Sequence, residues 1–344
     1  AAVSGAAAAV SGAAVGGGVR AAVCPPPAYG SLEVITEPYS YLLQVPGKGV
    51  RTQLIKAFNE WLQVDDEKVA EIAGVVQMLH TASLLIDDIE DNSTLRRGIP
   101  VAHAVYGVPW TINCGNYMYF KAMERCTAMG SAEATHHFLQ EMLRLHRGQG
   151  FDLYWRDSGT CPTEEEYIRM VEDKTGGLFR LAIHLMSVFS ECESDFIPLV
   201  TKLGVYFQIR DDYVNLQSSE YFAAKTYCED LSEGKFSFPI IHCVAANPHD
   251  RRLLNILKQR PTDADIKKYA VEYMELAGSF AYTRARLADV MAEIRAEYAR
   301  FPPNAALEAI LARLEAFDRG PEPERGHPAL RLSSEDVQDA PQDA

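Results

Sequence analysis

Apolar residues recur at intervals of three and four through most of the chain, from about residue 31 to residue 317. Residues at that spacing share one face of a helix, whereas a half-buried strand alternates with a period of two. No segment alternates for long enough to predict a strand convincingly, so the expected fold class is all-α. The predicted helices span residues 50–62, 66–93, 109–129, 132–155, 163–190, 196–218, 232–246, 250–258, 263–300 and 304–317.

Two of these helices are apolar around most of their surface, within residues 75–86 and 196–209. Helices of that kind are buried on most sides and belong at the centre of a large bundle. We therefore expect a bundle of about ten or more helices around a central cavity, with these two helices beside the cavity.

Acidic residues are concentrated near the C-terminal ends of the same two helices, in residues 87–91 (DDIED) and 211–215 (DDYVN). Positions i and i+4 share a helix face, and buried carboxylates this close repel one another unless a cation lies between them. Mg²⁺ prefers oxygen ligands and often completes its shell with phosphate oxygens. Two such clusters facing one cavity predict a site for metal ions and a diphosphate.

Basic residues near the first cluster extend this interpretation. Arg96 and Arg97 follow it just before a glycine, and guanidinium groups bind phosphate oxygens bidentately. Residues 47–51 (GKGVR) offer a lysine, an arginine and backbone amides at a helix start, and His80 lies two turns before Asp87 on one face. Taken one at a time, residues 87–91 fit a solvated helix end, residues 47–51 fit a basic loop, and His80 fits a core histidine. These explanations do not account for the three features occurring together.

Composition narrows the classes of function. The 344 residues are 47% hydrophobic and 23% charged, with a formal net charge of −14, which argues against a general nucleic-acid binder. No apolar run approaches the roughly 20 residues of a membrane span, so none is expected. The seven cysteines form no C-x-x-C pair, which favours free thiols in a reducing compartment, here the cytoplasm.

Three segments are expected along the chain. Residues 1–30 are rich in Ala, Gly and Pro and predict a flexible leader or linker, without the basic start and Leu-rich core of a signal peptide. Residues 31–318 form the catalytic domain, and residues 319–344 predict a disordered acidic tail.

Several motifs carry a resemblance to a known family. Residues 84–91 (LLIDDIED), 95–98 (LRRG) and 207–212 (FQIRDD) resemble the trans-isoprenyl diphosphate synthases, over about residues 31–300. Residues 117–120 (YMYF) and 146–150 (HRGQG) resemble the fungal and animal type of geranylgeranyl diphosphate synthase. The resemblance implies an isoprenoid-synthase-type bundle. It also implies head-to-tail elongation of allylic diphosphates with isopentenyl diphosphate, giving geranylgeranyl diphosphate and releasing diphosphate.

The resemblance also implies roles for individual residues. Three Mg²⁺ ions are expected at Asp87, Asp91 and Asp211, with Asp88, Asp212 and Asn215 completing the two clusters. Isopentenyl diphosphate is expected on Lys48, Arg51, His80 and Arg97. The allylic diphosphate is expected on Arg96, Lys174, Lys225 and Lys235, with Thr175 and Gln208 beside it. The catalytic residues implied are Asp87, Asp88, Asp91, Lys174, Gln208 and Asp211.

One position departs from the pattern of many family members, which carry Asp where this chain has Asn215. An amide still offers a carbonyl oxygen but no charge, so the first cluster is expected to hold metal more strongly. Gln149 and Asp152 are plausible hydrogen-bonding partners of the site. Gly176 and Gly177 interrupt an apolar helix, which predicts a kink or a close approach of the backbone to a ligand.

Product length should follow cavity depth. Ala82 and Ser83 are small, so the cavity is expected to stay open beside them, whereas farnesyl synthases often carry aromatic bulk there. Tyr119, Phe120 and His146 resemble the residues that close the cavity of geranylgeranyl synthases. The expected product therefore has twenty carbons.

Two other classes remain open from the sequence. A class I terpene cyclase shares the architecture and an acidic first motif, although residues 211–220 do not match the second metal motif of cyclases. A non-catalytic scaffolding subunit would keep the fold, although such subunits usually lose part of the metal or diphosphate set.

The expected partners also follow from the resemblance. A homodimer is expected, with a hexamer or larger ring as the alternative. The Ala/Pro-rich leader and the missing initiator Met suit the prenyltransferase domain of a fungal bifunctional terpene synthase, so a covalently linked terpene cyclase domain is an expected partner.

Overall fold

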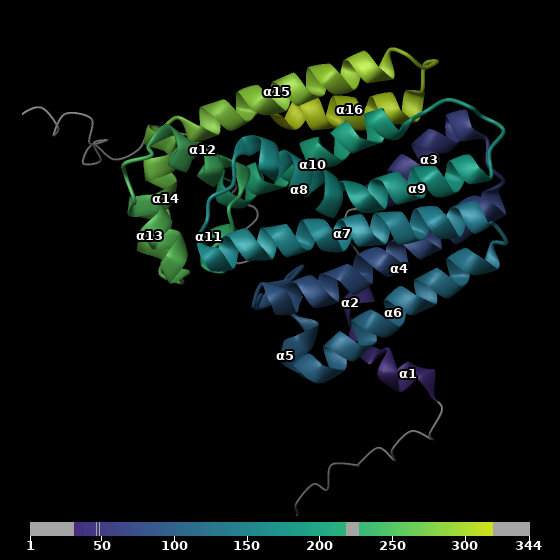
Figure 1. Cartoon of the computed structure of the whole chain (residues 1–344), viewed down its shortest axis with the longest axis horizontal. Helices are drawn as coiled ribbons and strands as arrows, with labels where there is room; N and C mark the ends of the chain where they lie inside the picture. The colour runs from purple at the N-terminus through teal and green to yellow at the C-terminus, as the bar shows by residue number, and fades with distance from the viewer. Residues whose placement is uncertain (1–30, 46, 48, 218–226, 319–344) are drawn as a thin grey trace, which may run out of the picture.

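The computed structural model describes residues 31–318 except 46, 48 and 218–226 (Figure 1). The predictions made for Lys48, Lys225, the leader, the acidic tail and a linked cyclase domain lie outside these residues. The described helices are α1 (Leu32–Ile35), α2 (Glu37–Leu43), α3 (Val50–Leu62), α4 (Asp66–Glu90), α5 (Ala102–Tyr106), α6 (Val108–Ala128), α7 (Ala132–Ser158), α8 (Glu164–Lys174), α9 (Gly176–Val188), α10 (Ile197–Gln217), α11 (Glu229–Glu233), α12 (Phe238–Ala246), α13 (Arg252–Gln259), α14 (Ala264–Leu276), α15 (Ser279–Tyr298) and α16 (Ala305–Asp318).

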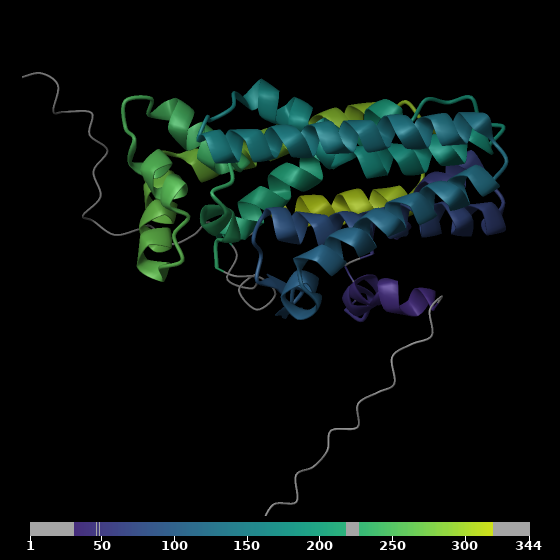
Figure 2. The ribbon, with the colours of Figure 1, turned by 60° about the horizontal axis from the view of Figure 1, so that its bottom comes forward.

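The predicted all-α bundle is confirmed. The long helices α4, α6, α7, α9, α10 and α15 run along the molecule, while α13 and α14 lie across one end (Figures 1 and 2). Leu79 and Leu85 of α4, and Leu203 and Ile209 of α10, are almost completely buried. The two helices that are apolar all round are therefore core helices, as the sequence predicts.

The sequence predicts the single long helices better than the broken ones. The prediction for α3 matches at both ends, and Asp65 caps α4 through a hydrogen bond from the Glu67 amide. Three predicted helices are each two helices in the structure: α8 and α9, α11 and α12, and α14 and α15. Gly234 and Gly278 adopt positive φ angles of 75° and 74° at two of these breaks. A glycine adopts that conformation without a steric penalty, so the chain turns there.

A short hairpin that the sequence does not reveal follows α4. Its strands β1 (Leu95–Arg96) and β2 (Ile99–Pro100) pair antiparallel. Arg97 and Gly98 form the turn with φ angles of 55° and 81°. The expectation that the chain has no strand is therefore corrected. Two-residue strands are too short to show the alternation from which a strand is predicted. The hairpin places both arginines beside the end of α4.

Glycines allow the helices to approach closely around the break between α8 and α9. A Cβ atom on Gly148 of α7 would lie 2.5 Å from the Lys174 amide nitrogen and 2.8 Å from the Met170 carbonyl oxygen. A Cβ atom on Gly204 of α10 would lie 3.0 Å from the Cα atom of Gly176. The break is thus clamped between two helices, whose backbones approach it closely.

Another glycine sets the approach of α6 to α4. A Cβ atom on Gly115 would lie 2.8 Å from the Cδ1 atom of Ile86 and 3.6 Å from the Ala82 carbonyl oxygen. Ala82 is completely buried in this contact, together with Leu85 and Cys114. The glycine therefore lets α6 lie against the cavity side of α4.

Among the described residues, α4 is long and apolar enough to cross a membrane by length and composition alone. Its apolar residues instead pack within the bundle, where Ile72, Val75 and Leu79 are completely buried. The same helix ends in acidic residues that face a cavity inside the protein. These contacts are those of a core helix of the bundle.

We expect Gly148→Ala to destabilise the protein, because the new methyl group meets backbone atoms that cannot move aside. The free energy of unfolding should fall by about 1–3 kcal/mol, measured by urea titration. Gly150→Ala is the matched control, since no atom lies within 4 Å of its Cβ position. That change should leave stability equal or raise it by about 0.5–1 kcal/mol. Equal losses in the two variants would contradict the close packing at Gly148.

Candidate active site

A cavity of about 260 Å³ opens where the C-terminal ends of α4, α8 and α10 meet α11. Besides Ser83, His146, Gln149, Thr175 and Gln208, its lining consists of an apolar, a basic and an acidic part. The apolar part is formed by Leu84, Ile86, Tyr119, Leu145 and Leu178, the basic part by Arg51, His80, Arg96, Lys174 and Lys235, and the acidic part by Asp87, Glu90, Asp91, Asp211, Asp230 and Glu233.

Each predicted main metal ligand lies in the acidic part. Asp87 and Asp91 come from the last turn and C-cap of α4, and Asp211 comes from α10. Burial and the nearby Asp87 carboxylate raise the pKa of Asp91 to about 7. A carboxyl group shifts in that direction when negative charge is concentrated in a poorly solvated place. The structure therefore brings the two distant clusters together, as the sequence predicts.

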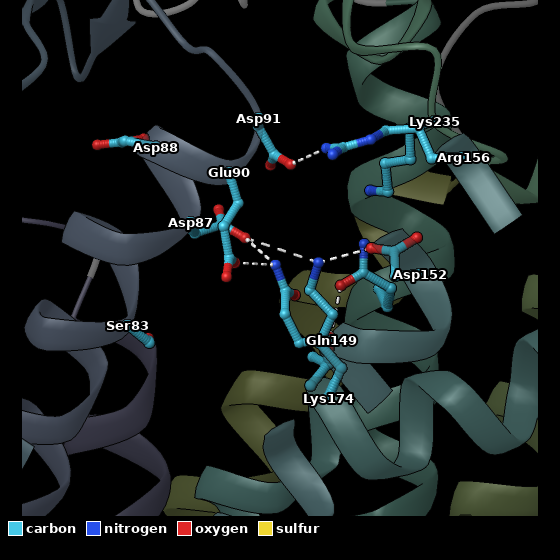
Figure 3. Close-up of polar contacts among 12 residues, drawn as sticks. Ser83, Asp87, Asp88, Glu90, Asp91, Gln149, Asp152, Arg156, Lys174 and Lys235 are labelled. Atoms are coloured by element: carbon cyan, nitrogen blue, oxygen red, sulfur yellow. Dashed lines mark hydrogen bonds and ion pairs between the residues drawn. The ribbon is translucent and has the colours of Figure 1, made fainter. Parts of the chain in front are cut away.

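Cations from neighbouring helices compensate these carboxylates (Figure 3). Lys174 Nζ lies 2.6 Å from Asp152 Oδ2 and 3.6 Å from Asp87 Oδ1. Although burial disfavours its charge, Asp152 and Asp87 raise the pKa of Lys174. Arg156 of α7 donates a 2.8 Å hydrogen bond to Asp91 Oδ1. The lysine and the arginine therefore hold the acidic group together from the opposite side of the cavity.

The oxygen donors of the cavity fit Mg²⁺ bound together with a phosphate. Within the part of the chain that the structure describes, no three His, Cys, Asp or Glu side chains converge tightly enough to chelate a metal ion alone. Mg²⁺ is usually bound through one or two carboxylates, with waters and substrate phosphates completing its shell. Asp87, Asp91 and Asp211 around one cavity fit that mode of binding.

The second aspartate of each cluster does not belong to this group. Asp88 is 1% exposed, points away from Asp87, and accepts a 2.7 Å hydrogen bond from Arg96 Nε (Figure 3). Burial raises the pKa of Asp88 to about 6, against the opposing effect of Arg96. Its predicted role as a metal ligand is corrected to that of an anchor for Arg96, because adjacent helical residues project about 100° apart.

Asp212 is likewise buried away from the cavity. Its two oxygens accept hydrogen bonds from Tyr167 Oη at 2.5 Å, Gln208 Nε2 at 2.8 Å, Lys235 Nζ at 3.1 Å and the Phe238 amide at 2.9 Å. Four protein donors leave little room for a metal ion on this carboxylate. Its predicted role as a metal ligand is therefore corrected to a structural one.

Asn215 also has a structural partner. It is 4% exposed, and its Oδ1 atom accepts a 3.2 Å hydrogen bond from the Asp230 amide at the start of α11. Its predicted role as a metal ligand is corrected, since the carbonyl oxygen supports α11. Because this side chain does not line the cavity, Asn in place of Asp at this position leaves the charge of the cavity lining unchanged.

Arg51 and His80, predicted for a second diphosphate, line the cavity, and Arg97 lies near both of them. Burial, Arg51, Arg97 and Arg96 all lower the pKa of His80, and burial and Arg97 lower the pKa of Arg51 to about 10. Cations depress one another's pKa in this way where they are crowded without matching anions. Arg97 donates to the Val45 carbonyl at 2.6 Å, which ties the hairpin to the loop before α3.

The helix break after α8 carries two of the predicted substrate-binding residues. Thr175 Oγ1 donates a 2.6 Å hydrogen bond to Gln208 Oε1, and Lys174 is held by Asp152. Gln149, predicted as a partner, donates to Glu90 Oε2 at 2.7 Å and to Asp87 Oδ1 at 3.4 Å (Figure 3). The break therefore links α4, α7 and α10 at one point of the cavity.

Of the predicted chain-length residues, three line the cavity and two do not. Ser83 and the neighbouring rings of Tyr119 and His146, whose centroids are 5.6 Å apart, belong to its lining. Ala82 is instead buried against α6, so its predicted place on the wall is corrected. Phe120 is 72% exposed and points away, so its predicted place at the floor is corrected as well. Neighbouring positions on a helix diverge, which explains both corrections.

The structure adds acidic and basic residues that the sequence prediction missed. Asp230 and Glu233 of α11 line the cavity opposite the first cluster. Burial, Asp91 and Asp230 raise the pKa of Glu233. The available signal was that the two acids are three residues apart, just before Lys235, but α11 is only five residues long. Arg156 was missed because nothing in the sequence links it to Asp91, 65 residues away.

Comparisons with known proteins agree with this geometry. A model of the family described as polyprenyl synthetase matches residues 32–274. This chain belongs to the polyprenyl synthetase family. It is 58% identical to a geranylgeranyl pyrophosphate synthase of Aspergillus flavus over 263 residues, 76% of this chain and 77% of that protein. It is 54% identical to a geranylgeranyl pyrophosphate synthase of Dictyostelium discoideum over 253 residues, 74% of this chain and 84% of that protein.

One relative bears a different name. The chain is 53% identical over 287 residues to a terpene synthase of Matsumurasca onukii, 83% of this chain and 95% of that protein. Membership of the family therefore fixes the fold and the class of chemistry, while the product has to be argued from the site.

Adjacent aspartates of α10 should behave differently in this polyprenyl synthetase. Asp212→Ala removes one partner of a buried network and should lower the free energy of unfolding by about 3–5 kcal/mol. Asp211→Ala, at an exposed position of the cavity, should change stability by less than about 0.5 kcal/mol and still abolish prenyl transfer. Urea titration and a product assay distinguish the two effects. A stable Asp212→Ala protein would refute the structural role given to that carboxylate.

Proposed function

We propose that this chain is a geranylgeranyl diphosphate synthase. It joins isopentenyl diphosphate to allylic diphosphates and releases diphosphate. The observation that carries the proposal is that one cavity has two places for a diphosphate. One is the carboxylate group around Asp87, and the other is the basic pair Arg51 and His80, beside which Arg97 lies close enough to lower the pKa of both. An enzyme with one diphosphate substrate has no use for the second group.

Each diphosphate has its own set of residues in the proposed mechanism. Asp87, Asp91 and Asp211 would hold Mg²⁺, which neutralises the charge that develops on the departing diphosphate. Lys174, Lys235 and Arg96 face the same end of the cavity and stabilise that charge by direct contact. Isopentenyl diphosphate binds at Arg51, His80 and Arg97, with its double bond toward the allylic carbon.

The chain's own residues also protect the reaction. Loss of diphosphate leaves an allylic cation, which the double bond of isopentenyl diphosphate attacks before a proton is lost. Leu84, Ile86, Leu145 and Leu178 line the part of the cavity beyond the charged residues. These apolar walls exclude the water that would otherwise quench the cation.

The test is an assay of the purified chain with Mg²⁺, isopentenyl diphosphate and each allylic diphosphate in turn. Mass spectrometry of the products should give a twenty-carbon diphosphate as the main species, and a metal chelator should abolish its formation. Absence of any condensation product would contradict the proposal and favour a non-catalytic scaffolding subunit.

A second candidate function is terpene cyclisation, favoured by the terpene synthase relative of Matsumurasca onukii. A cyclase needs the carboxylate group but not the second diphosphate site at Arg51, His80 and Arg97. Incubation with geranylgeranyl diphosphate alone separates the two functions. A hydrocarbon product without isopentenyl diphosphate would favour the cyclase, whereas the synthase should leave that substrate unchanged.

Tyr119 and His146 are proposed to limit the product to twenty carbons. Tyr119→Ala and His146→Ala remove bulk from the cavity lining and should each shift the products toward longer chains. Ile112→Ala is the control on the same helix, because this exposed side chain does not line the cavity and should not affect product length. Because one methylene is worth only about 1–3 kcal/mol of discrimination, mixed products are expected. Unchanged products in both cavity variants would refute the assignment.

We also propose that the protein is a homodimer joined through α6 and α7, which lie side by side (Figure 1). Phe120, Leu143 and Tyr154 are 72%, 67% and 61% exposed there, with Leu139 and Phe151 beside them. Leu139, Leu143, Phe151 and Tyr154 of α7 are separated by four, eight and three residues, so they lie on one face of the helix. An apolar stripe of this length is typical of an interface between subunits. A hexamer or larger ring is the alternative assembly.

Leu143→Asp should dissociate this dimer, because a carboxylate would be buried without a partner. Light scattering should then give the mass of one chain, 38.1 kDa, in place of twice that mass. Leu276→Asp of α14 is the control, since Leu276 is also exposed but lies away from α6 and α7. An unchanged mass for the Leu143 variant would contradict the proposed interface.

The cytoplasm is the proposed location. The six described cysteines, Cys114, Cys126, Cys161, Cys192, Cys228 and Cys243, are all free thiols, which supports a reducing compartment.

A further inference from the structure

We propose that Arg180, held by Glu141, is a positioning residue that keeps the helix open between α8 and α9. This inference rests on the proposed function, because the open segment presents Lys174 and Thr175 to the diphosphate substrate. Arg180 is not among the residues that line the cavity. Its contacts are instead directed at the backbone of the break.

The break frees a backbone carbonyl that Arg180 occupies. In a continuous helix, the carbonyl of residue 172 would accept a hydrogen bond from the amide of residue 176. Here α8 ends at Lys174 and α9 begins at Gly176, and the Glu172 carbonyl accepts a 2.6 Å hydrogen bond from Arg180 Nη1. The guanidinium therefore replaces the amide that the continuous helix would use.

Gly176 gives the guanidinium the space it needs. A Cβ atom at this position would lie 2.7 Å from Arg180 Nη1. Any larger residue would therefore push the guanidinium away from the Glu172 carbonyl. The glycine at the start of α9 thus has a specific use beyond chain flexibility.

Glu141 fixes the other side of the guanidinium. Arg180 Nη2 and Nε lie 2.7 Å and 3.1 Å from Glu141 Oε2, and both side chains are almost completely buried, at 4% and 2% exposed. Arg144 adds a 3.0 Å hydrogen bond to Glu141 Oε1. Because Glu141 belongs to α7, the pair also fixes the break against the helix that carries Asp152, the partner of Lys174.

A buried ion pair is poor evidence for a role in stability. Removing two charges from water is so unfavourable that apolar replacements of both partners are often neutral or stabilising. Arg180 of this pair instead donates to one backbone carbonyl, that of Glu172, which lies close to Lys174 and Thr175 in the chain. If the guanidinium is absent, the Gly176 amide is the donor that a continuous helix offers to that carbonyl, and forming that bond closes the break. Closure turns Lys174 and Thr175 away from Asp152 and Gln208.

The experiment replaces both partners at once, in the double variant Arg180→Met/Glu141→Leu. We expect a folded protein with a thermal midpoint near that of the wild type, and a kcat roughly 10- to 100-fold lower, as misplacement of a binding group produces. The KM for isopentenyl diphosphate should change less than about twofold, since Arg51, His80 and Arg97 lie elsewhere. Hydrogen exchange at residues 172–178 should slow as the helix closes.

Conservative and control variants complete the design. Arg180→Lys keeps one donor for the Glu172 carbonyl and should retain more activity than the double variant. Gly176→Ala displaces the guanidinium and should reproduce the loss of kcat, even if the double variant does not fold. Arg295→Met, which removes an arginine paired with Glu308 and Glu315, should leave kcat unchanged.

Two outcomes separate this inference from the proposed function. Wild-type kcat and unchanged hydrogen exchange in a folded double variant, or in Gly176→Ala, would overturn the positioning role. A wild-type protein that makes no twenty-carbon diphosphate would overturn the proposed function alone. The exchange measurement would then still decide whether Arg180 holds the helix open.

Discussion

Repulsion among carboxylates in a poorly solvated cavity is the constraint on which the rest of the structure depends. Asp87 and Asp91 sit at the C-terminal end of α4, where the helix dipole already presents negative charge. Glu233 and Asp230 approach them from α11. Such an arrangement is stable only if cations are supplied from outside these helices.

The packing of the bundle supplies those cations. Lys174 reaches Asp87 from the end of α8, and Arg156 reaches Asp91 from α7. Arg96 is turned toward the same end by the hairpin that follows α4, with Asp88 as its anchor. Each compensating charge therefore comes from a different element. The arrangement of charges in the cavity thus depends on how the helices of the bundle pack. This coupling explains why glycines are needed where α7 and α10 meet the α8–α9 break.

The sequence predicts what periodicity and spacing determine. The helices α3 and α4, and the shared face of Asp87 and Asp91, follow from the local chain alone. Whether Asp88 or Asp212 faces the cavity depends instead on distant partners, namely Arg96 and Tyr167. Local spacing carries no information about such partners.

Other features lie beyond the sequence for similar reasons. Phe120 and Tyr119 are adjacent in the chain but lie on different surfaces of α6, one exposed and one in the cavity. Short elements such as α11 and the hairpin have too few residues to show a period. The break at Gly176, in contrast, can be predicted from the sequence, because two glycines destabilise the interior of an apolar helix.

The contact between Gly115 and Ile86 has a consequence for how product length evolves. Because a glycine faces Ile86, the distance between α6 and α4 is close to its lower limit at this level of the cavity. A larger residue at position 115 meets the end of the Ile86 side chain, so either that side chain shifts or α6 moves outward and carries Tyr119 with it. If the end of the cavity limits product length as proposed, that limit depends on the spacing between these two helices. A family member could therefore change its product while every residue at the end of its cavity stays the same.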